Sequence, residues 1–407
     1  MVSRRILLTD GDQRSALACV RSLGRAGHQC FVLGPGRGGG LAGRSRYCTE
    51  GAQIVDAGRD PEGFLAAFEG ALKRWNIDVL FPMTEKTLRL VLPRRETYEG
   101  DGRLLPFPDA ETFRRVSDKA QVLEAAKEVG ITVPRQWVWG SLDEVDTTSV
   151  PPEAFPLAIK PSRSVGGPGV SGENPAVCYV DSPGGLSEWA AGVRPESFPA
   201  LAQERIIGDG VGVFLLVWEG NLRAAVGHRR IREKPPSGGV SAVRESTEPD
   251  PALLDRSLKL LGSMGWRSGV AMVEYKVRRD TGDPVLMEIN GRFWGSLQLA
   301  IDAGVDFPVL LLAAAEGSAE APAGQRGLVR GRPGVKTRWL LGDLDQLLLR
   351  LVRTPEELSL PPGHPGRLRA IVEFMADFRP GVRLEVLRWR DLRPFLSEAA
   401  AWIRALR

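Results

Sequence analysis

Residues 270–277 (VAMVEYKV) and 284–290 (PVLMEIN) have the character of two β-strands, and the polar segment 278–283 (RRDTGD) between them has that of a turn. Two strands joined by so short a turn pair in the antiparallel sense. We therefore predict a hairpin with Thr281 at the middle of its turn.

This hairpin brings acidic side chains to matching positions. With Thr281 at its centre, Glu274 lies opposite Glu288, and Met272 lies opposite Asn290. Because side chains alternate along a strand, Glu274, Glu288 and Asn290 share one face of the hairpin. The other face carries apolar side chains, namely Val273, Tyr275, Met287 and Ile289.

Two carboxylates that face each other repel unless a proton or a cation lies between them. Carboxylate and amide oxygens are the ligands that Mg²⁺ or Mn²⁺ prefers, and Mg²⁺ usually completes its coordination with water and nucleotide phosphates. Glu274, Glu288 and Asn290 are therefore candidate metal ligands. The alternative is a solvated sheet face on which these side chains simply stay hydrated.

Composition places the chain among ordinary globular proteins. It has 407 residues, of which 43% are hydrophobic and 26% are charged, and this length favours two or three domains. The 54 basic residues are nearly balanced by 50 acidic ones, so no nucleic-acid partner is indicated. Four cysteines without a C-x-x-C pair and three isolated histidines give little material for a zinc site.

The N-terminal region predicts a parallel sheet. Apolar strands at 6–8 and 31–33 flank a helix at 14–26, and a second helix at 61–75 precedes a strand at 79–81. We assign residues 1–115 to a Rossmann-like domain. A G-x-G-x-x-G fingerprint is missing from its first turn, which argues against a nicotinamide-dependent oxidoreductase.

The fold class that we predict is α/β and α+β. Ser117 is the expected N-cap of a helix that opens the second domain, residues 116–316, with lobes at about 116–201 and 202–316. Residues 317–335 are a predicted linker or loop, and residues 336–407 a helix-rich C-terminal extension. Charged residues and Pro308 interrupt the apolar stretch 297–316, and the N-terminus lacks a signal-peptide core, so we expect a cytoplasmic protein without a membrane partner.

Several short motifs occur together in one order along residues 6–316: SDK (117–119), AIKP (158–161), a glycine-rich loop (162–171), QERI (203–206) and MEINGR (287–292). Because these motifs occur together and in this order, the chain resembles the ATP-grasp superfamily, in the branch of carbamoyl-phosphate-synthetase-like domains and carboxylate–amine ligases. The resemblance implies a Rossmann-like domain before a two-lobed ATP-grasp domain, with ATP and Mg²⁺ (or Mn²⁺) as cofactors.

The resemblance also implies roles in nucleotide binding. Lys119 and Lys160 would reach the α- and β-phosphates, and Ser164, Gly166 and Gly167 would lie in a loop that closes over the triphosphate. Pro168 departs from the usual glycine pattern of that loop.

Three further residues would hold the nucleoside. Glu204 would take the adenine amino group, and the backbone of Ile206 would read the ring nitrogen. Asp209 is the ribose candidate, although many relatives have a glutamate slightly further along, where this chain has Val211.

The metal ligands implied by the resemblance are the same Glu274, Glu288 and Asn290. Arg292 matches the family's phosphate-binding arginine, so that Arg292 and Lys160 are the candidate catalytic groups. Gly291 stands where proline is common in the family.

The basic run 228–234 (HRRIREK) precedes a flexible turn. Alternation would direct Arg230 and Arg232 to one face, where they could orient a substrate carboxylate or the γ-phosphoryl group. A solvated basic edge strand is a comparable alternative.

The function predicted from these features is an ATP-dependent ligase that joins a small-molecule carboxylate to an amine. A nucleotide-binding regulatory protein without turnover is the alternative from another class, and a thiol or bicarbonate could replace the amine or the acid. The C-terminal extension is open to two roles, a cap over the site and a contact in a homodimer.

Overall fold

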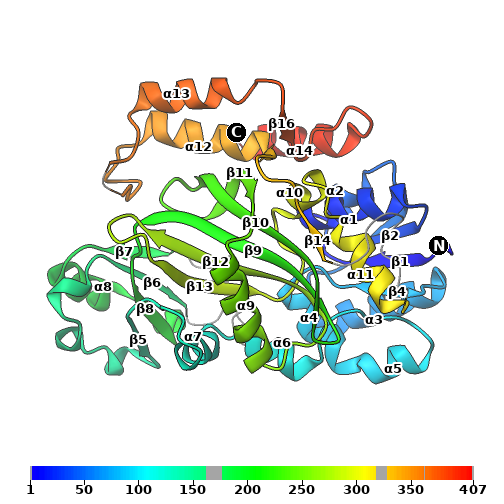
Figure 1. Cartoon of the computed structure of the whole chain (residues 1–407), viewed down its shortest axis with the longest axis horizontal. Coiled ribbons are helices and arrows are strands. Elements are labelled where there is room, and N and C mark those ends of the chain that lie inside the picture. The colour runs from blue at the N-terminus through cyan, green and yellow to red at the C-terminus, as the bar shows by residue number, and fades with distance from the viewer. Residues whose placement is uncertain (1, 162–176, 318–327, 362, 406–407) are drawn as a thin grey trace.

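The computed structural model describes residues 2–161, 177–317, 328–361 and 363–405. Their strands form three sheets, which lie side by side in Figure 1, and most helices pack on the outside of these sheets. The first sheet belongs to the N-terminal domain; most strands of the other two lie in the region that we assigned to two lobes, and later residues add strands to the central sheet.

The N-terminal sheet is parallel and has the order β3-β2-β1-β4, as predicted for a Rossmann-like domain. Its strands are β1 (Arg5–Leu8), β2 (Gln29–Gly34), β3 (Cys48–Gln53) and β4 (Val79–Phe81). The main helices are α1 (Arg14–Arg25) and α3 (Pro61–Arg74). Gly27 has a φ of 93°, which lets the chain turn sharply after α1. The sequence did not predict β3, because few of its residues are apolar.

The central sheet carries most of the antiparallel hairpins. Its order is β13-β12-β9-β10-β11-β15-β16, and β14 pairs with β10 beside this path. The strands are β9 (Gly208–Trp218), β10 (Asn221–Lys234), β11 (Val240–Thr247), β12 (Gly269–Arg278), β13 (Pro284–Asn290), β14 (Val329–Arg330), β15 (Lys336–Arg338) and β16 (Val382–Leu384).

A smaller antiparallel sheet, of order β5-β8-β6-β7, has its own apolar core. Its strands are β5 (Gln136–Trp139), β6 (Leu157–Pro161), β7 (Cys178–Val180) and β8 (Ala200–Glu204). The chain passes from this sheet to the central one at residues 205–207, and we call residues 205–210, which include the start of β9, the inter-lobe segment. The segment lies close to both lobes because it joins β8 directly to β9.

The hairpin register predicted at the acidic pair is confirmed. Glu274 pairs with Glu288 and Met272 pairs with Asn290. Beyond this point a β-bulge shifts the register, so that Tyr275 pairs with Leu286 and Met287 is the extra residue. The prediction that Met287 lies in the apolar face was therefore wrong there. Leu286 joins the buried cluster instead, together with Val273, Tyr275 and Ile289.

Two local predictions need correction. Asp118, rather than Ser117, is the N-cap of α7 (Lys119–Glu128), because its carboxylate accepts hydrogen bonds from the backbone N–H groups of Ala120 and Gln121. Ser117 instead ends α6 (Ala110–Val116). The predicted linker 317–335 contains β14, which pairs with Ala224 and Ala225 of β10, so this part is an element of the sheet.

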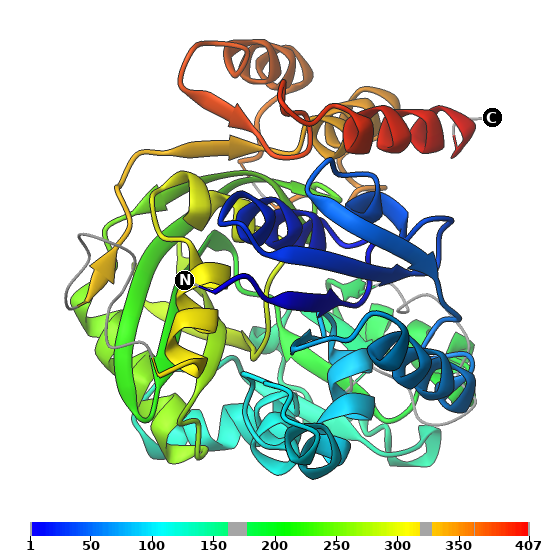
Figure 2. The ribbon, with the colours of Figure 1, turned by 90° about the vertical axis from the view of Figure 1, so that its right-hand side faces the viewer.

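The C-terminal extension is helix-rich, as predicted, but it also completes the central sheet. β15 pairs with β11, and β16 pairs with β15. The helices are α12 (Leu340–Val352), α13 (Arg367–Ala376) and α14 (Arg393–Ala405). These helices lie above the central sheet and the N-terminal domain (Figures 1 and 2).

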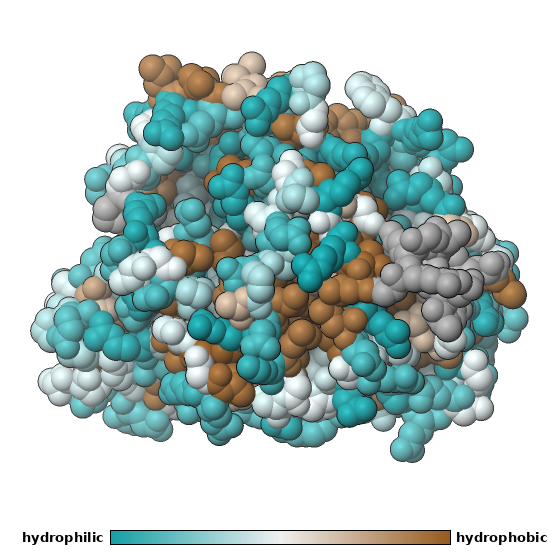
Figure 3. Space-filling model, viewed as in Figure 1, coloured by the Kyte–Doolittle hydropathy of each residue, from teal (hydrophilic) through white to brown (hydrophobic). Residues whose placement is uncertain are grey.

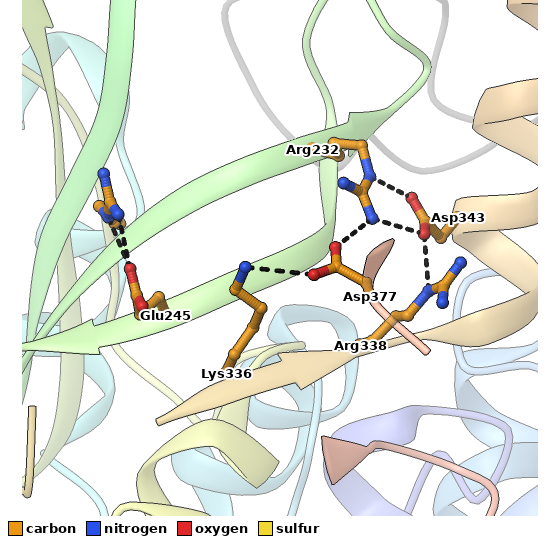
Figure 4. A network of polar contacts seen from close by, with 7 residues as sticks. Arg232, Glu245, Lys336, Arg338, Asp343 and Asp377 are labelled. Atoms are coloured by element: carbon orange, nitrogen blue, oxygen red, sulfur yellow. Dashed lines mark hydrogen bonds and ion pairs between the residues drawn. The ribbon is translucent and has the colours of Figure 1, made fainter. Parts of the chain in front are cut away.

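A buried network of charges fixes the extension to the sheet (Figure 4). Arg232 of β10 donates to both carboxylate oxygens of Asp343, at 2.7 and 2.9 Å, and to Asp377 at 2.6 Å. Arg338 also pairs with Asp343, and Lys336 with Asp377. Because Arg232, Asp343 and Arg338 are nearly or fully buried, the two parts are held in one arrangement.

A second contact ties the extension to the N-terminal domain. The buried Arg21 donates to the Asp391 carboxylate at 2.8 Å and to the backbone carbonyls of Glu385 and Val386. Ser45 donates to the same carboxylate at 2.7 Å. The extension therefore bridges both neighbouring domains.

The outer face of α13 is apolar. In the space-filling view apolar side chains gather over this helix at the upper left (Figure 3). Leu368, Val372, Met375 and Phe378 are between 55% and 75% exposed. Within the described ranges, no helix has both the length and the apolar character needed to cross a membrane.

Candidate active site

The candidate metal ligands lie on one face of the central sheet. Glu274 of β12 and Glu288 of β13 are paired neighbours, and the Asn290 amide nitrogen donates to Glu288 Oε1 at 3.0 Å. This bond leaves the Asn290 amide oxygen without a hydrogen bond among the described residues. Three oxygen-bearing side chains are therefore gathered at the end of one hairpin.

Cations surround the two carboxylates. Lys119, the first residue of α7, places its Nζ 3.5 Å from Glu288 Oε2. Arg230 of β10 forms an ion pair with Glu274 and another with Glu233, the latter at 2.8 Å. The side chain of Glu274 is 9% exposed, whereas that of Glu288 is 34% exposed. Glu288 is thus the carboxylate that is open to a ligand.

The two acids respond differently to their surroundings. Burial is the main reason that the pKa of Glu274 is raised; Arg230 opposes this effect and the nearby Glu288 carboxylate adds to it. Burial also disfavours ionised Glu288, but Lys119, the Asn290 hydrogen bond and Lys160 outweigh it, so that the pKa of Glu288 is lowered. The pair therefore holds a proton more readily on Glu274.

This donor set fits a hard divalent cation. Glu288 and Asn290 offer oxygens with free lone pairs, and the repulsion between Glu274 and Glu288 is relieved by a cation as well as by a proton. Arg230 already occupies one oxygen of Glu274, so a cation there would use the other oxygen or displace the guanidinium. Glu274, Glu288 and Asn290 are the residues that would hold Mg²⁺ or Mn²⁺.

Lys160 lies at the end of β6 in the smaller lobe. Its Nζ donates to Gln203 Oε1 of β8 at 2.9 Å, and Gln203 is 1% exposed. Burial, with a smaller contribution from Lys119, lowers the pKa of Lys160 to about 7. An anionic ligand beside this amine would restore its positive charge, as expected of a phosphate-binding lysine.

The residues predicted to hold the nucleoside lie at the end of β8 and in the inter-lobe segment. Ile206 is buried, and its carbonyl accepts a hydrogen bond from Lys276 Nζ at 3.2 Å. The Glu204 carboxylate is paired with Arg278 at 2.8 Å and lies 3.6 Å from Arg135 Nε. The side chain of Glu204 is thus already engaged by two arginines. Asp209 is exposed at the start of β9.

Arg230 and Arg232 have separate partners. A β-bulge between them leaves Ile231 without a paired residue and interrupts the alternation on which our prediction of a shared face rested. Arg230 pairs with Glu274 inside the site, whereas Arg232 pairs with Asp343 and Asp377 of the C-terminal extension. Arg230 therefore stays a substrate-binding candidate, and Arg232 takes part in fixing the extension.

The remaining predicted residues divide into two groups. Arg292 comes two residues after Asn290, the last residue of β13, and is therefore close to the metal ligands in the chain. Its Nη1 donates to the carbonyl of Phe293 at 3.0 Å. The loop residues Ser164, Gly166 and Gly167 lie outside the described residues.

Three glycines on β9, which we did not single out from the sequence, lie beside the acidic pair; we call them the glycine floor. Gly208, Gly210 and Gly212 alternate along β9, and Gly212 is paired with Glu274. A Cβ on Gly212 would lie 2.6 Å from the Val273 carbonyl oxygen and 2.7 Å from His228 Nε2. Close packing thus requires glycine at this position. The G-x-G-x-G spacing within a strand was the signal that could have revealed the floor.

His228 of β10 is paired with Gly212 of the glycine floor. Its ring stacks on Phe214 with centroids 4.3 Å apart, and it is 2% exposed. Neither ring nitrogen has a hydrogen-bond partner in the described part of the chain. Burial, together with Arg230 and Arg244, keeps the pKa of His228 well below its ordinary value, so the ring is neutral.

A cavity of about 210 Å³ adjoins these groups. Residues 205–210 line this cavity together with Arg230, Lys276 and residues of the C-terminal extension. The cavity therefore connects the predicted nucleoside-binding residues with a part of the chain that lies more than a hundred residues further on.

The parallel N-terminal sheet, the two following lobes and the acidic pair beside Lys119 and Arg230 are the arrangement expected of an ATP-grasp fold. Residues 196–333 match the model of a family described as ATP-grasp in the biosynthetic pathway with Ter operon. The resemblance to the ATP-grasp superfamily recognised in the sequence is therefore confirmed.

Known proteins agree with this fold. The carbamoyl phosphate synthase large chain of Thermus thermophilus is 25% identical over 264 residues, which cover 61% of this chain but only 25% of that relative. The structure of the L-amino acid ligase from Bacillus licheniformis matches with a TM-score of 0.59 and 16% identity, covering 78% of this chain and 75% of the ligase. The N5-carboxyaminoimidazole ribonucleotide synthetase from Thermus thermophilus matches with a TM-score of 0.55 and 17% identity, covering 81% of both chains.

Proposed function

We propose that this protein is an ATP-dependent ligase that joins the carboxylate of a small molecule to an amine. The observation that carries the proposal is the facing pair Glu274 and Glu288, held with Asn290 between Lys119 on one side and Arg230 on the other. Such a set of acids and cations suits a nucleotide whose phosphates arrive with a divalent cation.

The reaction has two steps. In the first, a carboxylate oxygen attacks the γ-phosphorus of ATP, the bond to the β-phosphate oxygen breaks, and ADP leaves. In the second, the amine nitrogen attacks the carbonyl carbon of the acyl phosphate, inorganic phosphate leaves, and the nitrogen loses a proton. The products are an amide, ADP and phosphate.

The residues of the site bind and orient the reacting groups. Lys119, Lys160 and Arg292 would neutralise the phosphate oxygens, since phosphoryl transfer depends mainly on positioning and charge stabilisation. Glu274, Glu288 and Asn290 would hold Mg²⁺, which when bound neutralises charge on the β- and γ-phosphates. Arg230 would orient the substrate carboxylate through paired N–H donors.

The names of the similar proteins support this class at a general level. Two of them are named as a ligase and a synthetase, and one is named as a carbamoyl phosphate synthase chain. A thiol could replace the amine, and bicarbonate could replace the organic acid, within the same phosphate chemistry.

A panel experiment tests the proposal. ADP release is measured with Mg²⁺, ATP and pairs of acids and amines, beside the Glu288→Gln variant. We expect release that needs both an acid and an amine and is lost in the variant. ¹⁸O placed in the acid should appear in the released phosphate; phosphate without the label would reject the acyl-phosphate route. Nucleotide binding without turnover for any pair would favour a regulatory protein.

A homodimer stays a prediction. The exposed apolar residues of α13, among them Val372 and Met375, supply a surface that could be buried between two copies. Light scattering on the wild type and on Val372→Glu tests this: a dimer that dissociates in the variant would support it, and a monomeric wild type would reject it.

A further inference from the structure

The cavity beside the inter-lobe segment has an unusual second wall. One wall is residues 205–210, which join the two lobes. The other comes from the C-terminal extension and includes Gln346 and Arg350 of α12 together with His364. A ligand that occupies the cavity would therefore touch the extension as well as the lobes.

Gln346 is the residue that points to a ligand. It lines the cavity and is only 4% exposed, yet its side-chain amide has no hydrogen-bond partner among the described residues. An amide in a cavity wall that makes no hydrogen bond to the described residues can bond to a molecule that enters the cavity. A ligand that supplies both a donor and an acceptor would satisfy it.

The wall that carries Gln346 is fixed. Three residues earlier on the same helix, Asp343 is held by Arg232 and Arg338 in the buried network of Figure 4. Further along the extension, the carbonyl of Ser359 accepts a hydrogen bond from Arg205 of the inter-lobe segment at 2.5 Å. The position of Gln346 relative to Ile206 is therefore set by contacts on both sides of the cavity.

We propose that Gln346 recognises the base of the bound nucleotide in the cavity that it lines together with Ile206. This inference rests on the proposed function as an ATP-dependent ligase and on the nucleoside-binding role that the resemblance implies for Ile206. A carboxamide places a donor and an acceptor side by side, and this arrangement matches the N6 and N7 edge of adenine. The extension thereby becomes part of the nucleotide site and sets its preference for adenine.

Gln346→Leu tests the inference, because it removes the amide and keeps a similar volume. Calorimetry measures the Kd for ADP and for GDP in the full chain. We expect ADP to bind about 10-fold more weakly, as for the loss of a pair of hydrogen bonds, and the preference for ADP over GDP to shrink by a similar factor. The melting temperature without ligand should not fall, because the substitution removes no hydrogen bond to the described residues.

A control and the contrary outcomes separate this inference from the proposed function. Gln53→Leu changes a glutamine on β3, whose amide donates to the Pro35 carbonyl, and should leave both Kd values unchanged. Unchanged ADP affinity and base preference in Gln346→Leu, with binding that still depends on Lys160, would overturn the inference alone. Gln346→Leu and Gln346→Met could instead both bind ADP and GDP more weakly by a similar factor and melt at a lower temperature. This result would show that Gln346 has a packing role and would also overturn the inference. A wild type that binds no adenine nucleotide would overturn the proposed function too.

Discussion

Glu274 and Glu288 face each other across β12 and β13, and each is paired with a different cation: Arg230 for Glu274 and Lys119 for Glu288. The two carboxylates thus belong to one site but differ in exposure and in proton affinity. Because Lys119 belongs to α7 and Arg230 to β10, this arrangement draws together three separate stretches of the chain.

Removing the exposed acid should abolish catalysis without unfolding the protein. We expect Glu288→Gln to lower the rate of ADP release by about 100-fold or more, because charge stabilisation at the phosphates is lost. The melting temperature of the ligand-free protein should stay the same or fall slightly, because the loss of attraction to Lys119 and Lys160 opposes the relief of repulsion with Glu274.

Glu245→Gln is the matched control on the same sheet, because Glu245 pairs with Arg229 away from the site. It should keep the wild-type rate of ADP release. Equal rates in wild type and Glu288→Gln would contradict the proposed role.

Nucleotide binding should be coupled to proton uptake through Lys160. Its pKa in the folded, ligand-free protein is about 7, below the ordinary value of 10.5, so the amine is mostly neutral at about pH 8. Phosphate oxygens favour the charged amine, and ADP binding should then take up part of a proton. Calorimetry in buffers of different ionisation enthalpy measures this uptake, and Lys160→Met should lose it.

The same lowered pKa makes stability depend on pH. Between about pH 7 and pH 10.5 the unfolded chain holds a proton on Lys160 that the folded chain has lost, so the free energy of unfolding rises with pH from this group. Denaturant unfolding at several pH values should show a shallower rise in Lys160→Met than in wild type. Identical slopes would argue against a neutral Lys160.

The buried network between β10 and the extension should be costly to break. We expect Asp343→Asn to lower the free energy of unfolding by about 3–5 kcal/mol, because Arg232 and Arg338 lose a buried partner. Arg229→Gln disrupts an exposed pair with Glu245 on the same sheet and should cost no more than about 1 kcal/mol. Similar losses in both variants, measured by denaturant unfolding, would contradict the importance of burial.

The glycine floor should not tolerate a methyl group. In Gly212→Ala the new Cβ would meet the backbone oxygen of Val273 and the ring of His228, neither of which can move freely, so we expect a loss of about 1–3 kcal/mol. Gly70→Ala is the control: Gly70 lies inside α3 with open space around its Cβ position, and alanine should stabilise the helix by about 0.5–1 kcal/mol. Thermal unfolding of both variants measures the difference.

Several strands and the hairpin that carries the acidic pair could be predicted from local sequence patterns. Strands β1 and β4 and the pairing of Glu274 with Glu288 follow from apolar runs, a short polar turn and the two-residue period of a strand. These features depend on neighbours in the chain, and short-range rules therefore predict them. The same rules failed at Met287 and at Arg232, because β-bulges change the alternation and a bulge leaves no clear mark in the sequence.

The contacts of the C-terminal extension could not be predicted from the sequence. Nothing near Gln346 in the chain indicates that it lines the same cavity as Ile206, since this depends on how α12 packs against β10. Likewise, the sequence predicted Arg232 to be a substrate-binding residue, whereas in the structure it pairs with Asp343 and Asp377. Contacts between distant segments arise from packing and charge pairing in three dimensions, and a single sequence carries no direct record of them.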